Sequence, residues 1–309
     1  MTSVLDALHF HDEDAAYEYV ERHLWPDGPT CPHCGNVDAT KIGRLQGKTT
    51  RTGLRKCYAC RKPFTVKMGT IFEDSHAPLR LWLQAIYLLC SCKKGISTRQ
   101  LQRTLGVGMK TAWFMGHRIR HAMAPAEGSG PLGGAGKIVE ADETYLGKSP
   151  KTRKPEGHIP YQHNAQQVFS LVERGGNIRS KAIHHGNLRA HLQREVHEDT
   201  LLVSDSAPYY KGQFVKHEAV DHSKYEWKRG EAHTNTLEGF FSIFKRGLIG
   251  TYQHMDKRHL DRYLAEFDFR QNTRAKLGFT DETRVDEALK GFKAKRLTYE
   301  GTSGPKTTI

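Results

Sequence analysis

Three acidic residues that are far apart in the sequence could share one metal site. Asp142 and Asp205 each stand near the end of a short apolar run, a pattern that predicts a strand. Glu238 lies in the stretch 233–246, whose pattern predicts a helix. Carboxylates fixed on rigid elements supply the oxygen ligands that Mg²⁺ prefers, with positions left open for phosphate oxygens. Asp142, Asp205 and Glu238 therefore predict a two-metal site for phosphoryl transfer.

A simpler interpretation exists for the first acid. The stretch 137–147 also carries Glu140 and Glu143, so it could be an edge strand with solvated acids. The acids near 205 and 238, together with the charge of the chain, favour the metal site over this alternative.

The composition indicates a polyanionic partner. The 309 residues include 47 Lys and Arg against 34 Asp and Glu, which gives a net charge of +13. Such an excess is typical of proteins that bind nucleic acid. No apolar run reaches the roughly 18 residues that span a bilayer, and residues 1–11 lack the pattern of a signal peptide. Six cysteines do not suggest a disulfide scaffold. We expect a cytoplasmic, nucleoid-associated protein that binds DNA and no membrane.

The helix expected over 233–246 would carry a cation beside its acid. Asn235, Glu238, Ser242 and Lys245 are spaced by three, four and three residues, so Glu238 and Lys245 share one face. The carboxylate could bind the metal while the lysine on the same helix face binds the DNA phosphate. A solvated helix face with chance spacing is the alternative. Arg246 is a further candidate for DNA contact.

Two C-x2-C pairs predict a structural zinc site. Cys31, Cys34, Cys57 and Cys60 would bring four thiolates together in the tetrahedral arrangement that Zn²⁺ prefers. Redox-active or free cysteine pairs are the alternative. The hairpin between the pairs is basic and could contact DNA, although zinc ribbons also dock proteins; its basic residues are Lys41, Arg44, Lys48, Arg51, Arg55 and Lys56. The stretch 64–72 is expected to complete the ribbon as a strand.

A helix-turn-helix is predicted after the ribbon. Ser97 and Gln100 form a capping-box signature for a short helix that ends at Leu105, and a glycine turn separates it from a second helix over 109–120. This layout places Lys110, Thr111 and Trp113 near a DNA groove at the start of the second helix; those three residues are the predicted DNA-binding residues. An ordinary helical hairpin in a core is the alternative.

The remaining order of elements predicts an α/β catalytic domain. After the glycine-rich linker come the Asp142 strand, a hairpin, a polar helix, the Asp205 strand and further helices, which matches a ribonuclease-H-like sheet. In such a sheet the first and fourth strands are adjacent, so Asp142 and Asp205 would meet. The expected divisions are 1–75 for an N-terminal helix and the ribbon, 76–127 for the helix-turn-helix region, 128–136 for the linker, 137–300 for the catalytic domain and 301–309 for a disordered tail.

These motifs together resemble a known family. The ribbon cysteines are followed by GTIFEDSH, VEADETYLGK, VSDS and HTNTLEGFFSIFKRGLIGTY. This series is similar to the insertion-sequence 1595 (ISXO2-like) type of DDE transposases, in which a zinc ribbon precedes the catalytic domain. The likeness spans about residues 10–273.

The resemblance implies a ribonuclease-H-like fold, Mg²⁺ or Mn²⁺ as the catalytic metal, strand cleavage at transposon ends and strand transfer into target DNA. Asp142 and Asp205 match the first two acids of the family. Its members use either glutamate or asparagine at the third position, so Asn235 and Glu238 are both candidates. Glu238 is favoured because a carboxylate binds metal better than an amide. Two DNA ends must be handled, so we expect a homo-oligomer on DNA whose ribbon and helix-turn-helix bind terminal inverted repeats.

Two other functions fit parts of the sequence. A zinc-ribbon and helix-turn-helix regulator without catalysis would leave the three acids without a role. A metal-dependent nuclease derived from a transposase would cut DNA without joining it.

Overall fold

The computed structural model describes residues 3–125, 128–147, 166–183, 188–205, 210, 212, 214, 216–220, 229, 232–293, 295 and 297. Their contacts form two compact units, each described here by itself: Met1–Ala124 with Phe279–Ile309, called the N-terminal unit, and Pro125–Gly278, called the central unit. The tail expected over 301–309 lies outside the described residues. No helix in the described part of the chain has the length and apolar character needed to cross a membrane.

The N-terminal unit begins with a capped helix and a small sheet. Asp12 accepts a hydrogen bond from the Ala15 amide at 2.8 Å and starts α1 (Glu13–Leu24). Three short antiparallel strands follow, β1 (Ile42–Arg44), β2 (Arg55–Cys57) and β3 (Pro63–Phe64). The expectation of a strand over 64–72 is wrong beyond its first residue, because Gly69 has φ of +70° and the chain turns there.

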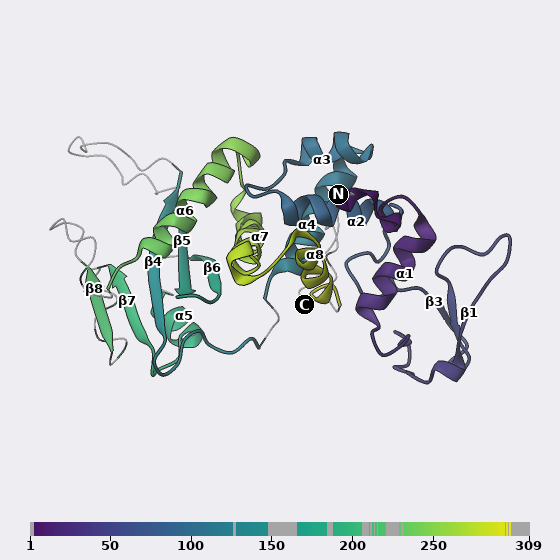
Figure 1. Cartoon of the computed structure of the whole chain (residues 1–309), viewed down its shortest axis with the longest axis horizontal. Coiled ribbons are helices and arrows are strands. Elements are labelled where there is room, and N and C mark those ends of the chain that lie inside the picture. Colours follow the sequence, from purple (N-terminus) through teal and green to yellow (C-terminus); the bar gives the residue numbers. More distant parts are fainter. Residues whose placement is uncertain are drawn as a thin grey trace, which may run out of the picture. The chain divides into compact units, whose positions relative to one another are not determined.

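Helices form the rest of the N-terminal unit (Figure 1): α2 (Leu79–Ser91), α3 (Thr98–Leu105), α4 (Met109–Met123) and α8 (Asp281–Lys290). Ser97 caps α3, accepting from the Gln100 amide at 3.2 Å, and Gly106 ends it in the left-handed region with φ of +65°. Two helices joined by the turn 106–108 are therefore present where the sequence predicts them.

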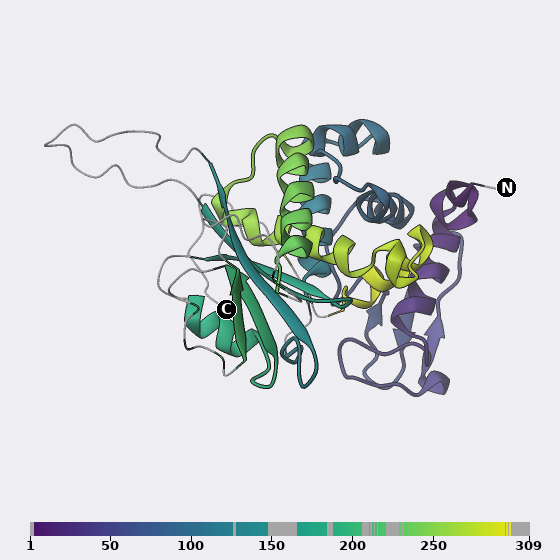
Figure 2. The same ribbon diagram turned by 60° about the vertical axis from the view of Figure 1, so that its left-hand side comes forward.

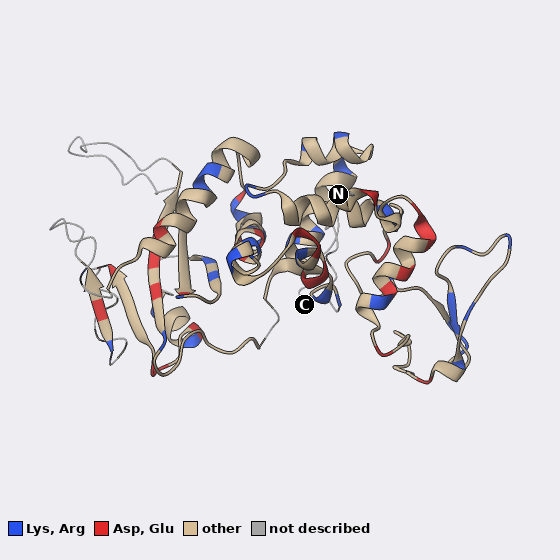
Figure 3. Cartoon of the chain, viewed as in Figure 1, with Lys and Arg blue, Asp and Glu red and all other residues tan. Residues whose placement is uncertain are grey.

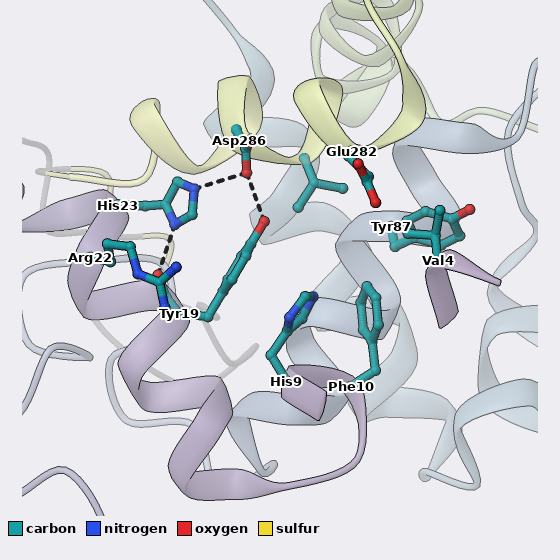
Figure 4. Close-up of a pocket in the computed structure, with 10 residues that line it drawn as sticks. Val4, His9, Phe10, Tyr19, Arg22, His23, Tyr87, Glu282 and Asp286 are labelled. Atoms are coloured by element: carbon teal, nitrogen blue, oxygen red, sulfur yellow. Dashed lines mark hydrogen bonds and ion pairs between the residues drawn. The ribbon is translucent and has the colours of Figure 1, made fainter. Parts of the chain in front are cut away.

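Helix α8 is tied to α1 by a partly buried polar cluster. Asp286 of α8 accepts a hydrogen bond from the Tyr19 hydroxyl at 2.7 Å and lies 2.9 Å from His23 Nε2 (Figure 4). These groups line a cavity of about 320 Å³. Because its polar groups bond to one another, we assign the cluster to anchoring. Its contacts group α8 with the N-terminal unit, whereas the sequence prediction includes this helix in a catalytic domain over 137–300; the domain limits themselves stay a prediction.

The central unit is built on a five-stranded mixed sheet. Its strands are β4 (Ile138–Leu146), β5 (Gln166–Glu173), β6 (Ile178–Ile183), β7 (Leu201–Asp205) and β8 (His217–Val220), in the order β6-β5-β4-β7-β8. The first three strands pair antiparallel, and β4, β7 and β8 run parallel. The predicted adjacency of the first and fourth strands is present. The short strand β8 was not foreseen.

Helices cover both faces of this sheet (Figure 2). Helix α5 (Leu188–Glu195) packs Leu192 against Val139, Phe169 and Leu202 on one face. On the other face, α6 (Asn235–Gly247) and α7 (Leu260–Asn272) pack aromatic residues such as Phe244 and Phe267 on the sheet. A single π-helical turn, Leu248–Tyr252, continues α6. The sheet is therefore held rigid between two apolar layers.

Helix α7 also occupies the free edge of strand β6. Asp261 accepts from the Ala182 amide at 2.9 Å, and Asp268 accepts from the Ser180 amide at 2.6 Å. Asn272 bonds both the amide and the carbonyl of Ile178, at 2.7 and 3.0 Å. Three side chains of one helix thus satisfy alternate backbone groups of the edge strand.

Candidate functional site

The pairing of β4 with β7 brings the first two predicted acids together. These parallel strands are aligned so that Ala141 faces Ser204, and Asp142 and Asp205 follow these residues. Carboxylate oxygens of Asp142, Glu143 and Asp205 all lie within 4.8 Å of one another. A group of three acids at this separation can bind a hard cation such as Mg²⁺ through oxygen.

Glu143 is the member of this group that sequence reasoning did not select. Side chains alternate along a strand, so consecutive acids offered no reason to expect a shared ion. In the structure the Tyr210 hydroxyl donates a hydrogen bond to Glu143 Oε1 at 2.6 Å, which orients the carboxylate. No pattern in the sequence links Tyr210 to this acid.

Glu140 fastens the start of α6 to the same strand. Its side chain is fully buried and accepts hydrogen bonds from the Thr236 amide at 3.0 Å and from the Thr236 hydroxyl at 2.9 Å. Arg174 Nε donates to the same carboxylate at 2.8 Å, and the Leu237 amide lies 3.4 Å from it. A carboxylate at a helix N-terminus satisfies unpaired amides and favours the helix dipole. Glu140 thereby sets the position of α6 relative to Asp142, two residues further along β4.

One exposed stripe of α6 and its continuation faces the acids. Glu238, Ser242, Lys245 and Ile249 are exposed and line a cavity of about 510 Å³ together with Asp142, Glu143, Thr144, Phe241 and Arg246. Figure 3 shows the basic residues of α6 toward the end of the helix at Gly247 and the acidic residues along β4. The predicted proximity of Glu238 and Lys245 to Asp142 is thus present, although Glu238 lies outside the 4.8 Å group.

The other candidate for the third position stands apart. Asn235 is the first residue of α6, is exposed, and is absent from the lining of this cavity. Arg246 lines the cavity, and its Nε donates to the Ser242 carbonyl at 3.1 Å. The catalytic roles of all these residues remain predictions.

The negative charges in this cavity affect Asp142 most clearly. Burial, followed by the negative charges of Asp205 and Glu238, raises the pKa of Asp142 to about 7. The Glu143 amide, which donates to Asp142 Oδ1 at 2.7 Å, and the Lys245 ammonium act in the opposite direction. A bound cation would offset the negative charges that raise the pKa of Asp142, so the donor set fits a divalent metal.

The four ribbon cysteines meet the geometry of a zinc site. Their Sγ atoms lie within 4.8 Å of one another, with Cys31 to Cys60 at 3.7 Å and Cys34 to Cys57 at 3.8 Å. Zn–S bonds of about 2.3 Å at tetrahedral angles separate sulfur atoms by about 3.8 Å. The spacing therefore fits structural Zn²⁺ held by four thiolates.

Part of the basic hairpin in the ribbon is used internally. Arg55 forms a two-bond contact with Glu21 of α1, at 2.6 and 3.1 Å, and Arg44 lies 3.3 Å from Glu18. These two arginines dock the ribbon on α1, a role that the sequence pattern did not reveal. Fewer of its basic residues are thus available for DNA.

The predicted contacts at the start of α4 lie beside a large cavity. Lys110 and Thr111 are exposed, Trp113 is half-buried, and all three line a space of about 770 Å³. Exposure leaves Lys110 and Thr111 accessible to a partner, but DNA contact by these residues stays a prediction.

Two family models match separate parts of the chain. Residues 131–272 match the family model described as an ISXO2-like transposase domain, and residues 11–63 match the transposase zinc-ribbon domain. The chain carries an ISXO2-like transposase domain and a transposase zinc ribbon. Over 290 residues, this transposase is 27% identical to a protein of Halobacterium salinarum described as an uncharacterized protein in transposable element ISH50, a match that covers 87% of the present chain and 94% of the relative.

A chain of one solved structure, the Mos1 strand transfer complex, is also similar. The match covers 63% of the transposase and 77% of the Mos1 complex chain. The sequence identity is 12% and the TM-score is 0.21, so this likeness carries no argument about the fold.

Proposed function

We propose that this transposase cuts DNA strands at the ends of an insertion sequence and joins them to target DNA, with its chemistry at the Asp142 and Asp205 cluster. The observation that carries the proposal is the meeting of these acids with Glu143, within 4.8 Å, at adjacent strands. The sheet order β6-β5-β4-β7-β8, with two antiparallel and two parallel strand pairings, supports a ribonuclease-H-like core.

Each residue has a role that follows from its position. Asp142 and Asp205 hold the divalent metals, Mg²⁺ or Mn²⁺, and Glu238 completes the set from across the cavity, with Asn235 as the alternative. Divalent metals held there would supply the activation of water or a 3′-hydroxyl and the stabilisation of the leaving oxygen in an in-line displacement. Lys245 and Arg246 hold the phosphate backbone beside the acids. No covalent link between protein and DNA is required.

The N-terminal unit is proposed to recognise the DNA ends. Lys110, Thr111 and Trp113 at the start of α4 would enter a groove as in helix-turn-helix proteins. Exposed basic residues of the zinc ribbon would add contacts to phosphate. Because two ends must be joined, we propose that at least two copies act together.

The test is the substitution Asp142→Asn in the full-length protein. The variant should bind a duplex from the end of the encoding element like the wild type, but cut and join it at least about a hundredfold more slowly, because a catalytic metal loses a ligand. Asp199→Asn is the matched control, since it removes the same charge from an exposed site near the opposite end of β7. Equal cutting by Asp142→Asn and the wild type would refute the assignment.

The same assay separates the alternatives. Cleaved but unjoined products would identify a nuclease. Binding without any metal-dependent cleavage by the wild type would favour a regulator.

A further inference from the structure

Two large apolar side chains stay exposed in the central unit, and both border the acids. Ile249 is 76% exposed and Tyr145 is 51% exposed, and no other large hydrophobic residue in the described part of this unit is comparably exposed. Isolated exposed apolar residues are common and need no function. Here, however, Ile249 lines the cavity of the acids, and Tyr145 stands two residues from Glu143 on β4, which calls for a ligand with apolar surface beside the acids.

Ile249 continues the functional stripe of α6. Glu238, Ser242, Lys245 and Ile249 follow at intervals of four, three and four residues and line the same cavity. Lys245 and Ile249 are one turn apart, about 6 Å along the axis. Ile249 belongs to the single π-helical turn Leu248–Tyr252, and such turns occur frequently at functional sites. A ligand along this stripe would meet an acid, then a cation, then an apolar side chain.

Tyr145 flanks the acids from the strand. It follows Glu143 by two residues on β4, so both side chains leave the same face of the sheet, about 7 Å apart.

We propose that Ile249 and Tyr145 contact unstacked DNA bases next to the phosphate held by the acids, so that the strand is separated from its complement there. The inference rests on the proposed function, because it needs DNA at this cavity. A paired duplex presents mainly phosphate and sugar to a protein surface, and these groups give exposed apolar side chains little to bind. Unstacked bases present apolar faces that stack on aromatic rings and accept wedges such as isoleucine. Lys245 and Arg246 supply the positive charge that holds the backbone on the same side.

The experiment compares two forms of one DNA end: a fully paired duplex and a duplex mismatched at the two base pairs beside the cut. Ile249→Ser and Tyr145→Ala should each slow Mg²⁺-dependent cutting of the paired form roughly tenfold, the size expected for one lost base contact. Both should cut the mismatched form at nearly the wild-type rate, because opening is already done. Ile249→Leu and Tyr145→Phe keep the apolar surface and should cut both forms normally.

A second readout does not depend on cutting. The probe is 2-aminopurine, placed in the fully paired duplex at one of the two base pairs beside the cut. Binding of the wild type should raise the fluorescence of this base, and binding of Ile249→Ser should not. The inference is overturned if the serine variant raises fluorescence like the wild type, or if it cuts both DNA forms equally slowly. A wild type that opens the end but never cuts it would refute the proposed chemistry and leave the base contact standing.

Discussion

Replacing Glu140 by alanine should destabilise the central unit more than the same replacement of any exposed acid. The substitution removes a fully buried carboxylate that pairs with Arg174 and satisfies the Thr236 and Leu237 amides. Removing one partner of a buried ion pair costs about 3–5 kcal/mol, because the other charge is left without compensation. For a unit of this size, that loss lowers the melting temperature by roughly 6–20 °C.

The assay is scanning calorimetry of the full chain, with Glu195→Ala as control. Glu195 also pairs with an arginine of the central unit, Arg179 at 2.9 Å, but Glu195 is 18% exposed whereas Glu140 is fully buried, so solvent screens the charge of Glu195 more. Glu140→Gln keeps the shape and one acceptor oxygen, so it should fall between the wild type and Glu140→Ala. A melting temperature for Glu140→Ala no lower than for Glu195→Ala would contradict the role assigned to this residue in holding α6.

Three further outcomes are expected. Cys31→Ser should lower bound zinc by elemental analysis and reduce the stability of the N-terminal unit alone, because one of four thiolates is lost. Lys110→Ala should weaken DNA binding and flatten the plot of log affinity against log salt by about 0.9, the contribution of one phosphate contact. Burial raises the pKa of Asp268 to about 7 from 3.8, so the wild type should lose stability as pH rises from about 4 to 7, by at most about 1.4 kcal/mol per pH unit; Asp268→Asn should lack this loss.

The sign of the Asp268 effect follows from proton binding. Between these pH values the folded carboxyl keeps its proton while the unfolded one releases it, so rising pH favours unfolding. Parallel pH profiles for the wild type and Asp268→Asn, measured by urea unfolding, would count against it. An unchanged zinc content in Cys31→Ser would remove the zinc assignment. An unchanged salt slope in Lys110→Ala would place that residue away from the DNA backbone.

Local patterns were sufficient for much of this structure. The two C-x2-C pairs predicted the thiolate cluster because each pair is closed by a tight local turn. Apolar runs that end in an acid predicted the strands of Asp142 and Asp205, and the order of elements predicted that these strands are neighbours. The helical spacing of Glu238 and Lys245 predicted the face that lines the cavity.

Contacts between distant segments were not visible in the sequence. In the sequence, Glu140 looks like one more acid of an acidic patch, because the amides that it binds lie almost a hundred residues further along the chain. Arg55 reads as a DNA contact until its pairing with Glu21 is seen. The strand β8 is only four residues long and is defined by its neighbour β7 rather than by its own pattern.

The covering of β6 by α7 has a consequence for assembly. A sheet edge with free amides can recruit a strand from another molecule, which is a common route to both ordered dimers and aggregates. Here the outward amides of Ile178, Ser180 and Ala182 already bond to α7. Copies of this protein therefore cannot associate by extending the sheet past β6 unless α7 first detaches from that strand. A synaptic assembly has to form through other surfaces.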